Sequence, residues 1–227
     1  MPKPAPSVSR GTITVLAGVN GAGKSSVAGA YIRAAGGDYF NPDEFTRSLL
    51  RQNPGLDPAE ANSLAWTRGK ECLAHAIVAG TDFVFETTLE AQTIPQLLAR
   101  AAKDSMAVKI YFVGLASVEH HLRRVAARVA DGGHDIPEAK IRERWENSRL
   151  NLIRLLPHLA ELMVWDNSIE GDLGKVAAAP VLVLHLRKGT LLAPKNLSAT
   201  PAWAKPIVAA ALKLQSSRLT DVYANYA

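Results

Sequence analysis

Cysteine, aromatic residues and long apolar runs are all scarce in this chain. Its one cysteine, Cys72, allows neither an internal disulfide nor a zinc site built from several cysteines. Aromatic residues make up 6% of the sequence, and no apolar run approaches the roughly 20 residues of a membrane-spanning helix. The first ten residues lack the apolar stretch of a secretory signal. We therefore expect a cytoplasmic protein that contacts no membrane.

The overall composition is that of a globular protein. Hydrophobic residues account for 48% and charged residues for 21% of the 227 positions, which excludes a disordered or collagen-like chain. The 26 lysines and arginines exceed the 21 aspartates and glutamates, for a net charge of +5. That excess favours anionic ligands without distinguishing a nucleotide from a nucleic acid. The length predicts one domain over residues 12–227, preceded by a disordered leader at 1–11.

Strand patterns alternate with helix patterns along the chain. This alternation predicts an α/β fold, a three-layer sandwich around a mostly parallel sheet. We expect the strand at 180–186 to lie at the sheet edge, residues 191–201 to form a loop, and a C-terminal helix to end near residue 215. The expected strands are 12–18, 38–40, 82–86, 107–114, 161–165 and 180–186, and the expected helices are 24–35, 43–52, 57–79, 93–103, 117–131, 136–156 and 202–215.

Residues 18–25, Gly-Val-Asn-Gly-Ala-Gly-Lys-Ser, match the complete phosphate-binding pattern G-x-x-x-x-G-K-[ST]. The match lies between a predicted buried strand and a predicted helix, as the mechanism of a P-loop requires. Lys24 is expected to reach the β- and γ-phosphates of ATP, and the Ser25 hydroxyl to ligate Mg²⁺. The expected nucleotide-binding residues are Gly18, Asn20, Gly21, Ala22, Gly23, Lys24, Ser25 and Ser26.

Acidic residues follow two of the predicted strands, where ligands of an open parallel sheet bind. Asp43 and Glu44 come after the strand at 38–40, and Glu86 ends the strand at 82–86, with Thr88 beyond it. A carboxylate there could accept the proton of an attacking hydroxyl or hold Mg²⁺ through water, and a threonine could orient the acceptor. The competing interpretation is a carboxylate that only caps a helix or ends a strand by chance.

The segment 120–154 has the properties of a lid over the transferred phosphate. It is rich in arginine around the hinge-like residues 131–134, and phosphoryl transfer needs fixed cations around its transition state. The candidate lid arginines are Arg124, Arg128, Arg142 and Arg144. A solvated helix face is the alternative for each. No apolar strand ends in an aspartate at the usual magnesium-binding place of motor ATPases, which favours a small kinase. The four tryptophans, Trp66 included, are expected in the core.

In combination these stretches resemble the zeta-toxin family of P-loop kinases. The resemblance rests on the phosphate loop, on Asn-Pro-Asp-Glu-Phe at 41–45, and on Phe-Glu-Thr-Thr-Leu at 85–89. It extends to Arg-Val-Ala-Asp-Gly-Gly-His-Asp-Ile-Pro at 128–137, to the run at 142–151 and to Trp-Asp-Asn-Ser at 165–168. Together these stretches span most of residues 12–170.

The resemblance implies a kinase with a helical lid that moves the γ-phosphate of ATP to a sugar hydroxyl of UDP-N-acetylglucosamine or a related nucleotide sugar. It implies Asp43 as general base, acceptor contacts from Glu86 and Thr88, and Arg128 on the γ-phosphate. Glu44, beside Asp43, is a further candidate for binding the acceptor. Whether a separate antitoxin protein is a partner stays open.

The chain departs from the family pattern E-G-T-x-R, because Thr87 stands in place of glycine and Glu90 in place of arginine. The family's second lid arginine falls near residues 133–134, so Arg142 or Arg144 would have to substitute.

Two other functions stay open. One is a kinase for another hydroxyl, such as an antibiotic, a nucleoside or a nucleic-acid end, although only Trp145 lies among the lid arginines where a nucleic-acid groove would carry more aromatics. The other is a nucleotide-binding regulatory protein with little turnover.

Overall fold

A six-stranded sheet forms the centre of the molecule, with strand order β2-β1-β3-β4-β5-β6. The computed structural model describes residues 10–34, 36–131, 133, 135–169 and 179–224. The first four strands in that order are parallel, and β5 and β6 are antiparallel to their neighbours. The strands are β1 (Thr12–Ala17), β2 (Phe83–Thr87), β3 (Ala107–Gly114), β4 (Glu161–Asp166), β5 (Val181–Arg187) and β6 (Thr190–Ala193).

Helices α2 and α3 begin where the sequence supplies a side-chain cap. Asn41 and Asp57 accept hydrogen bonds from the first free backbone N–H groups of α2 and α3, and each helix has proline in its first turn. The helices are the π-helical turn η1 (Ser25–Gly29), α1 (Ala30–Ala34), α2 (Pro42–Gln52), α3 (Pro58–Ala79), α4 (Thr93–Lys103), α5 (Val118–Ala130), α6 (Glu138–Leu155) and α7 (Lys205–Ala224), with 3-10 turns η2 (Leu156–His158), η3 (Leu197–Ala199) and η4 (Ala202–Ala204).

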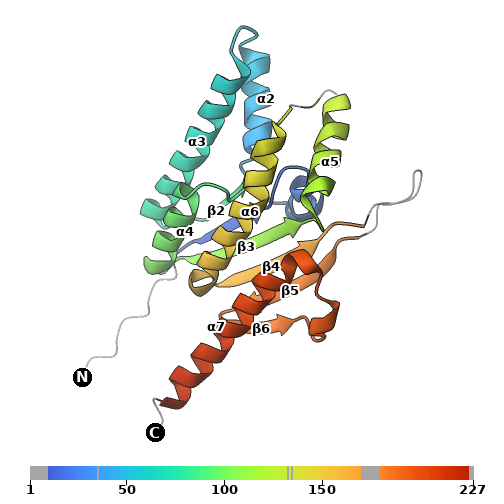
Figure 1. Ribbon diagram of the computed structural model, residues 1–227. Coiled ribbons are helices and arrows are strands. Elements are labelled where there is room, and N and C mark those ends of the chain that lie inside the picture. The colour runs from blue at the N-terminus through green and yellow to red at the C-terminus, as the bar shows by residue number, and fades with distance from the viewer. Residues whose placement is uncertain (1–9, 35, 132, 134, 170–178, 225–227) are drawn as a thin grey trace.

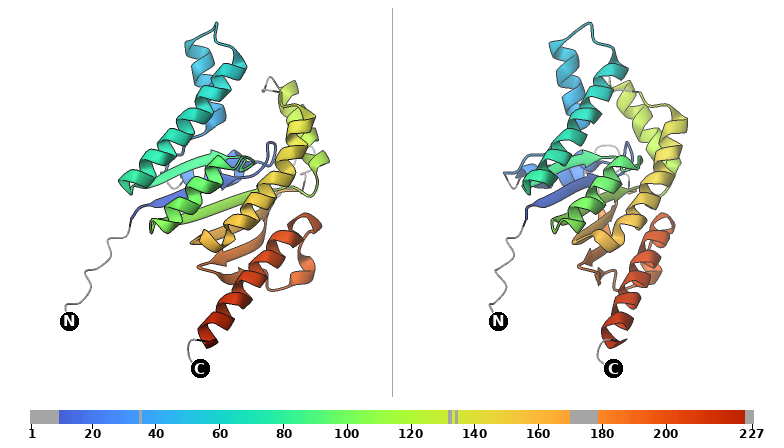
Figure 2. Two further views of the ribbon diagram at one scale, coloured as in Figure 1. Left: turned by 60° about the vertical axis from the view of Figure 1, so that its left-hand side comes forward. Right: turned by 90° about the vertical axis from the view of Figure 1, so that its left-hand side faces the viewer.

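Helices lie on both sides of the sheet (Figures 1 and 2). One face is covered by α3, α4, α6 and α7, while η1 and α1 lie on the other. The main core lies under the four-helix side, where Val15 and Ile110 of the sheet meet Leu73, Leu98 and Leu152 of three helices. Apolar burial is the main force that holds these layers together. The strand directions and the helices on both faces (Figure 1) confirm the predicted α/β fold with a mostly parallel sheet.

Two predictions for the sheet were wrong. The expected strand at 38–40 is a single parallel bridge, in which Phe40 pairs with Phe85 of β2. The strand near residue 180 is not at the edge, because β6 pairs with it from inside the segment expected to be a loop. Lys188 and Gly189 both have positive φ, as a two-residue hairpin turn between strands requires. The sequence analysis did not recognise that Lys-Gly turn.

The chain ends also differ from expectation. Arg10, in the predicted leader, donates hydrogen bonds to the carbonyls of Asp104 and Val78, and the Gly11 amide bonds to Gly80. The rest of that leader, 1–9, lies outside the described residues. Helix α7 continues past residue 215 to Ala224. None of the helices in the described part combines the length and apolarity that crossing a membrane requires.

Two helical pairs extend beyond the carboxyl ends of the parallel strands. Figure 2 shows α2 with the adjoining half of α3 on one side, and α5 with α6 on the other. A small apolar cluster joins α5 and α6 to the phosphate loop, in which Val19 packs with Val125 and Ile141. The predicted lid segment 120–154 is therefore a helical hairpin packed on that loop. Its predicted hinge, 131–134, includes positions 132 and 134, which lie outside the described residues.

Candidate active site

The loop from Gly18 to Ser25 has the backbone of a phosphate cradle. Gly18, Gly21 and Gly23 adopt φ values of +142°, +79° and +89°, which residues with a Cβ rarely adopt. The following turn η1 begins at Ser25, and its N-cap residue Lys24 makes no side-chain capping hydrogen bond, so a phosphate could accept from the N–H groups at its start. The loop therefore has the conformation that a P-loop requires, and nucleotide binding by its residues stays a prediction.

Residues far along the chain hold the loop in place. The Asn167 side chain, just after β4, donates to the carbonyl of Ala22 at 2.9 Å, and Arg124 donates to the Asn167 carbonyl at 2.7 Å. The buried His121 ring of α5 lies with Nδ1 2.9 Å from the carbonyl oxygen of Asn20. Since a carbonyl can only accept, Nδ1 carries the proton. Arg124 thus supports the loop through Asn167.

His121 makes the attachment of the loop to α5 sensitive to acid. Burial lowers the pKa of His121 to about 4, from an ordinary 6.5. The unfolded chain takes up this proton below about pH 6.5 and the folded chain only near pH 4, so the stability contributed by neutral His121 is present above pH 6.5 and is lost as pH falls.

We expect the free energy of unfolding of the wild-type protein to fall by about 2–3 kcal/mol more than that of His121→Gln between pH 7.5 and pH 4.5. Urea unfolding at the two pH values measures this difference. The exposed His75 provides the control, since His75→Gln should keep the wild-type pH dependence. An unchanged pH dependence in His121→Gln would show that another group titrates.

Glu86 connects the two residues that end the phosphate motif. Its buried carboxylate accepts a hydrogen bond from the Ser25 hydroxyl at 2.8 Å and lies 3.5 Å from the Lys24 ammonium. The Asn41 side-chain amide lies 3.5 Å from the same carboxylate. A buried carboxylate is tolerated only when such partners compensate its charge. The three groups therefore hold Glu86 at the entrance to the phosphate loop.

The donor set around Ser25 fits a magnesium ion of the P-loop type. Among the described residues, no group of three or more His, Cys, Asp and Glu side chains is arranged to hold a metal by itself. Magnesium bound with a nucleotide needs less, because phosphate oxygens and water supply most of its octahedral ligands. A hydroxyl and a carboxylate 2.8 Å apart, Ser25 and Glu86, are suitable for one direct ligand and one contact through water.

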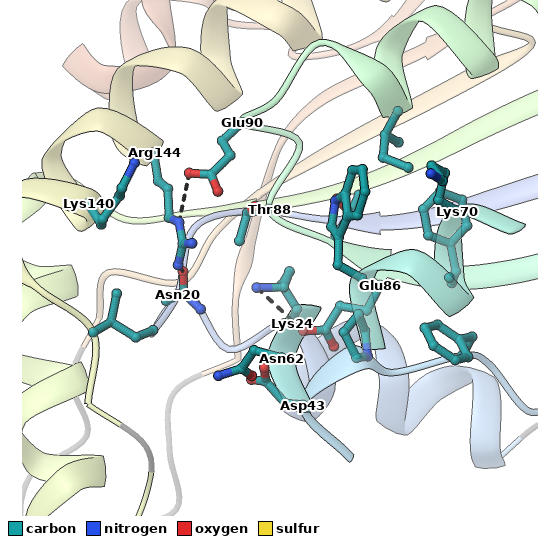
Figure 3. A pocket seen from close by; sticks show the side chains of 18 of the residues that line it. Asn20, Lys24, Asp43, Asn62, Lys70, Glu86, Thr88, Glu90, Lys140 and Arg144 are labelled. Carbon is teal, nitrogen blue, oxygen red and sulfur yellow. Dashed lines mark hydrogen bonds and ion pairs between the residues drawn. The ribbon is translucent and has the colours of Figure 1, made fainter. Parts of the chain in front are cut away.

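A cavity of about 330 Å³ opens beside the phosphate loop. Figure 3 shows polar side chains entering it from the loop (Asn20, Lys24), from α2 (Asp43), from the end of β2 (Glu86) and from α6 (Arg144). Thr88 lines it too, and its carbonyl accepts a hydrogen bond from Ser148 of α6. Asp43 and Glu86, which the sequence places after two separate strands, therefore line one cavity together with Lys24.

The predicted lid arginines have four different environments. Arg144 lines the cavity, and Arg128 lies 3.7 Å from the Asp43 carboxylate. Arg124 supports the phosphate loop, as described above. Arg142 is half exposed and pairs with Glu138 and Glu119 on the surface, so the solvated-face alternative holds for it alone.

Two sequence-based assignments need correction. Glu44 forms an exposed ion pair with Arg33 at 2.8 Å, and it is absent from the described lining of the cavity, which includes its neighbour Asp43. Trp66 is not in the core: it is 45% exposed and lines the cavity from α3. The spacing of Asn62, Trp66 and Lys70, four residues apart on one predicted helix, was a signal for a shared face; all three line the cavity.

A comparison with protein families identifies the domain that carries this site. Residues 13–149 match the model of the AAA domain family AAA_33, and this range contains the phosphate loop, Asp43, Glu86 and Arg144. The chain belongs to the AAA domain family. An uncharacterized protein of Haemophilus influenzae is 31% identical over 129 residues, which cover 56% of this chain and 88% of that protein. The membership fixes the domain type and leaves the acceptor open.

Solved structures of low sequence identity share the fold. A chain of the AvrRxo1-ORF1:AvrRxo1-ORF2 complex with ATP is 18% identical, with a TM-score of 0.60 over 86% of this chain. The matched part is 65% of that longer chain. A chain from the structure of the PezAT chromosomal toxin-antitoxin system of Streptococcus pneumoniae is 14% identical, with a TM-score of 0.53. The match covers 97% of this chain and 91% of that chain. The chain therefore shares its overall fold with these two proteins.

Proposed function

We propose that this protein is an ATP- and Mg²⁺-dependent kinase that transfers the γ-phosphate to a hydroxyl group of a small molecule. One observation carries the proposal. The Asp43 carboxylate, which could take the hydroxyl proton, and the Lys24 ammonium, which could hold the phosphate, line the same open cavity. The AvrRxo1 complex determined with ATP supports ATP as the donor.

The proposed reaction is a single in-line displacement. The acceptor oxygen forms a bond to the γ-phosphorus while the bond from that phosphorus to the β,γ-bridging oxygen breaks, and ADP leaves. The acceptor proton passes to the Asp43 carboxylate. Lys24 and Arg144 face the phosphoryl oxygens, whose charge they balance. Arg128 beside Asp43 orients the base.

Magnesium supplies charge neutralisation on the β- and γ-phosphates when it is bound with ATP. Ser25 would hold it directly and Glu86 through water, as their donor geometry allows. On ATP binding, we expect the Lys24 ammonium to turn from the Glu86 carboxylate toward a phosphate. Glu86 would then keep its contacts with Ser25 and Asn41.

For the acceptor, we propose UDP-N-acetylglucosamine or a related nucleotide sugar. The α3 side of the cavity supports an acceptor with a planar ring and anionic groups. Trp66 presents an exposed ring there, and Lys70 lies 5.0 Å from its centroid. Lys140 lines the cavity from α6. An aromatic surface stacks on a base, while the ammonium groups attract phosphates.

Trp66→Ala is expected to raise the KM for the nucleotide-sugar acceptor by about tenfold or more, because base stacking contributes roughly 1–3 kcal/mol. The KM for ATP should stay within about twofold. Steady-state kinetics with each substrate varied in turn separates the two. Leu64 on the same helix is equally exposed, at 45%, and Leu64→Ala is the control. Equal KM values for wild type and Trp66→Ala would remove Trp66 from the acceptor site.

The decisive experiment is incubation of the purified protein with Mg-ATP and UDP-N-acetylglucosamine, followed by mass spectrometry. A new phosphorylated sugar nucleotide is the expected product, and its formation should stop when ATP is replaced by its β,γ-imido analogue. If ATP is consumed only when a different hydroxyl compound is present, the kinase proposal stands and the acceptor is wrong. Tight ATP binding without product from any hydroxyl acceptor would instead favour a nucleotide-binding regulatory protein.

A partner protein that controls the site is a second part of the proposal. The solved neighbours include the two-protein AvrRxo1 complex and a toxin-antitoxin system. That these neighbours occur with partner proteins supports the proposal of a separate antitoxin protein for this chain.

A further inference from the structure

We propose that Glu90 and Asn20 are positioning residues that hold the Arg144 guanidinium ready for the γ-phosphate, an inference that rests on the proposed function. Glu90 lies in the loop after β2, Asn20 in the phosphate loop, and Arg144 on α6. Arg144 Nε donates to the Glu90 carboxylate at 2.7 Å, and Nη1 donates to the Asn20 side-chain oxygen at 2.9 Å. Figure 3 shows the Arg144 side chain between those of Glu90 and Asn20.

This ion pair differs from the surface pairs of the same helix. The side chains of Arg144 and Glu90 are 22% and 25% exposed, whereas those of Arg142 and Glu138 are 48% and 62% exposed at a similar separation, 2.8 Å. Partial exclusion of water strengthens the attraction between charges, and surface pairs contribute little. The Glu90 contact therefore fixes its arginine more firmly than the Glu138 contact does.

The chemistry of arginine explains how one side chain could be held and still bind phosphate. A guanidinium has five N–H donors in a rigid plane. Nε is engaged with Glu90 and one N–H of Nη1 with Asn20, so the two N–H groups of Nη2 and the second one of Nη1 are the donors that would reach a phosphate oxygen. Because the side chain is ordered on folding, less conformational entropy is lost when ATP binds.

Asn20 connects Arg144 to the phosphate loop through a hydrogen bond. Its side chain accepts from Arg144 of α6, and its backbone carbonyl accepts from His121 of α5. Both helices of the hairpin thus contact one residue of the loop, two positions beyond Gly18. A phosphate held by the loop would lie next to Asn20, so the guanidinium bound to Asn20 would lie beside that phosphate.

The test is calorimetric measurement of the dissociation constants of Mg-ATP and Mg-ADP, whose ratio reports recognition of the γ-phosphate alone. We expect wild type to prefer ATP, and Arg144→Ala to lose that preference by roughly tenfold, the value of one charge-assisted hydrogen bond. Glu90→Gln and Asn20→Ala should each lose about threefold to tenfold of the preference. ADP affinity should stay within about twofold in Arg144→Ala and Glu90→Gln.

Glu138→Gln is the matched control, because it removes the carboxylate of the exposed pair on the same helix and should keep the wild-type ratio. Arg144→Lys tests whether charge alone suffices, because an ammonium keeps the charge but cannot contact Glu90 and Asn20 in the same geometry. This variant should also lose preference for ATP. Thermal unfolding monitored by circular dichroism verifies that each variant folds.

Glu90→Gln with an unchanged ratio, or with tighter ATP binding, would overturn the proposal, because Glu90 would then be neutral toward the phosphate or would repel it. A wild-type protein without preference for ATP over ADP would overturn it as well. Neither result depends on an acceptor or on turnover. Failure to phosphorylate any acceptor would therefore refute the kinase while the ATP-to-ADP ratio still decides the role of Glu90.

Discussion

Asp43→Asn is expected to slow phosphotransfer by about 10²- to 10⁴-fold, the contribution of a general base. Asparagine keeps the shape of the side chain and removes its ability to take the acceptor proton. The affinity for Mg-ATP should change little, because the phosphate loop is built by other residues. The variant should also fold normally, since Asp43 is 56% exposed and its ion pair with Arg128 is long, at 3.7 Å.

The neighbouring carboxylate gives a matched comparison for Asp43. Glu44 lies one position further along α2 and pairs with Arg33 outside the cavity. Glu44→Gln removes the same kind of charge from the same helix turn, and its turnover number should stay within about twofold of wild type. Turnover numbers for wild type and both variants at saturating ATP make the comparison. If Asp43→Asn retained full turnover, the base would have to be another group; if Glu44→Gln lost as much, the effect would belong to the helix end.

The sequence predicted the site best where chemistry and local structure coincide. The phosphate motif from Gly18 to Ser25 specifies its own conformation through glycines, so its position between a strand and a helix could be predicted without tertiary information. Asp43 and Glu86 were found by a topological rule, that parallel strands end at one edge of a sheet. The α/β fold followed from the alternation of strand and helix patterns, and the structure confirms it.

The sequence could not predict which arginine faces the cavity. Arg142 and Arg144 are two residues apart on α6, and they point to different sides because of the helical period. Only tertiary packing decides that Arg144 meets Glu90, which is 54 residues away in the chain. The departure at position 90, a glutamate where the resembling family has arginine, gains a physical explanation from this pair. A cation still enters the cavity, carried by α6 instead of the loop after β2.

The shape of the acceptor side was also beyond the sequence. Trp66 is apolar and lies on a long helix, and such residues are usually buried. Its exposure follows from the way α2 and α3 extend past the sheet, where no strand is available to cover them. The hairpin turn at Lys188 and Gly189 was missed for a different reason, because lysine is not a typical residue at a turn position with positive φ.

Lys24→Met is expected to reduce phosphotransfer by at least roughly 10³-fold, because it removes the cation closest to the transferred phosphate. The same substitution has a structural consequence. Lys24 is the ammonium partner of the buried Glu86, and removing one partner of a buried ion pair costs about 3–5 kcal/mol. Loss of activity in this variant could therefore come from the phosphate or from a disturbed loop, and kinetics of the single variant would not separate the two.

The double variant Lys24→Met with Glu86→Gln separates them. A neutral amide at position 86 can accept from the Ser25 hydroxyl without a buried charge to balance, so the double variant should recover most of the lost free energy of unfolding in urea titrations. Phosphotransfer should remain at the level of Lys24→Met or below it, because neither the phosphate cation nor the carboxylate for the magnesium water is restored. Recovery of activity together with stability would mean that Lys24 serves mainly to neutralise Glu86. Stability without activity would show that a disturbed loop is not the cause of the lost activity, and the single variant Glu86→Gln, which keeps Lys24, measures the share of the carboxylate.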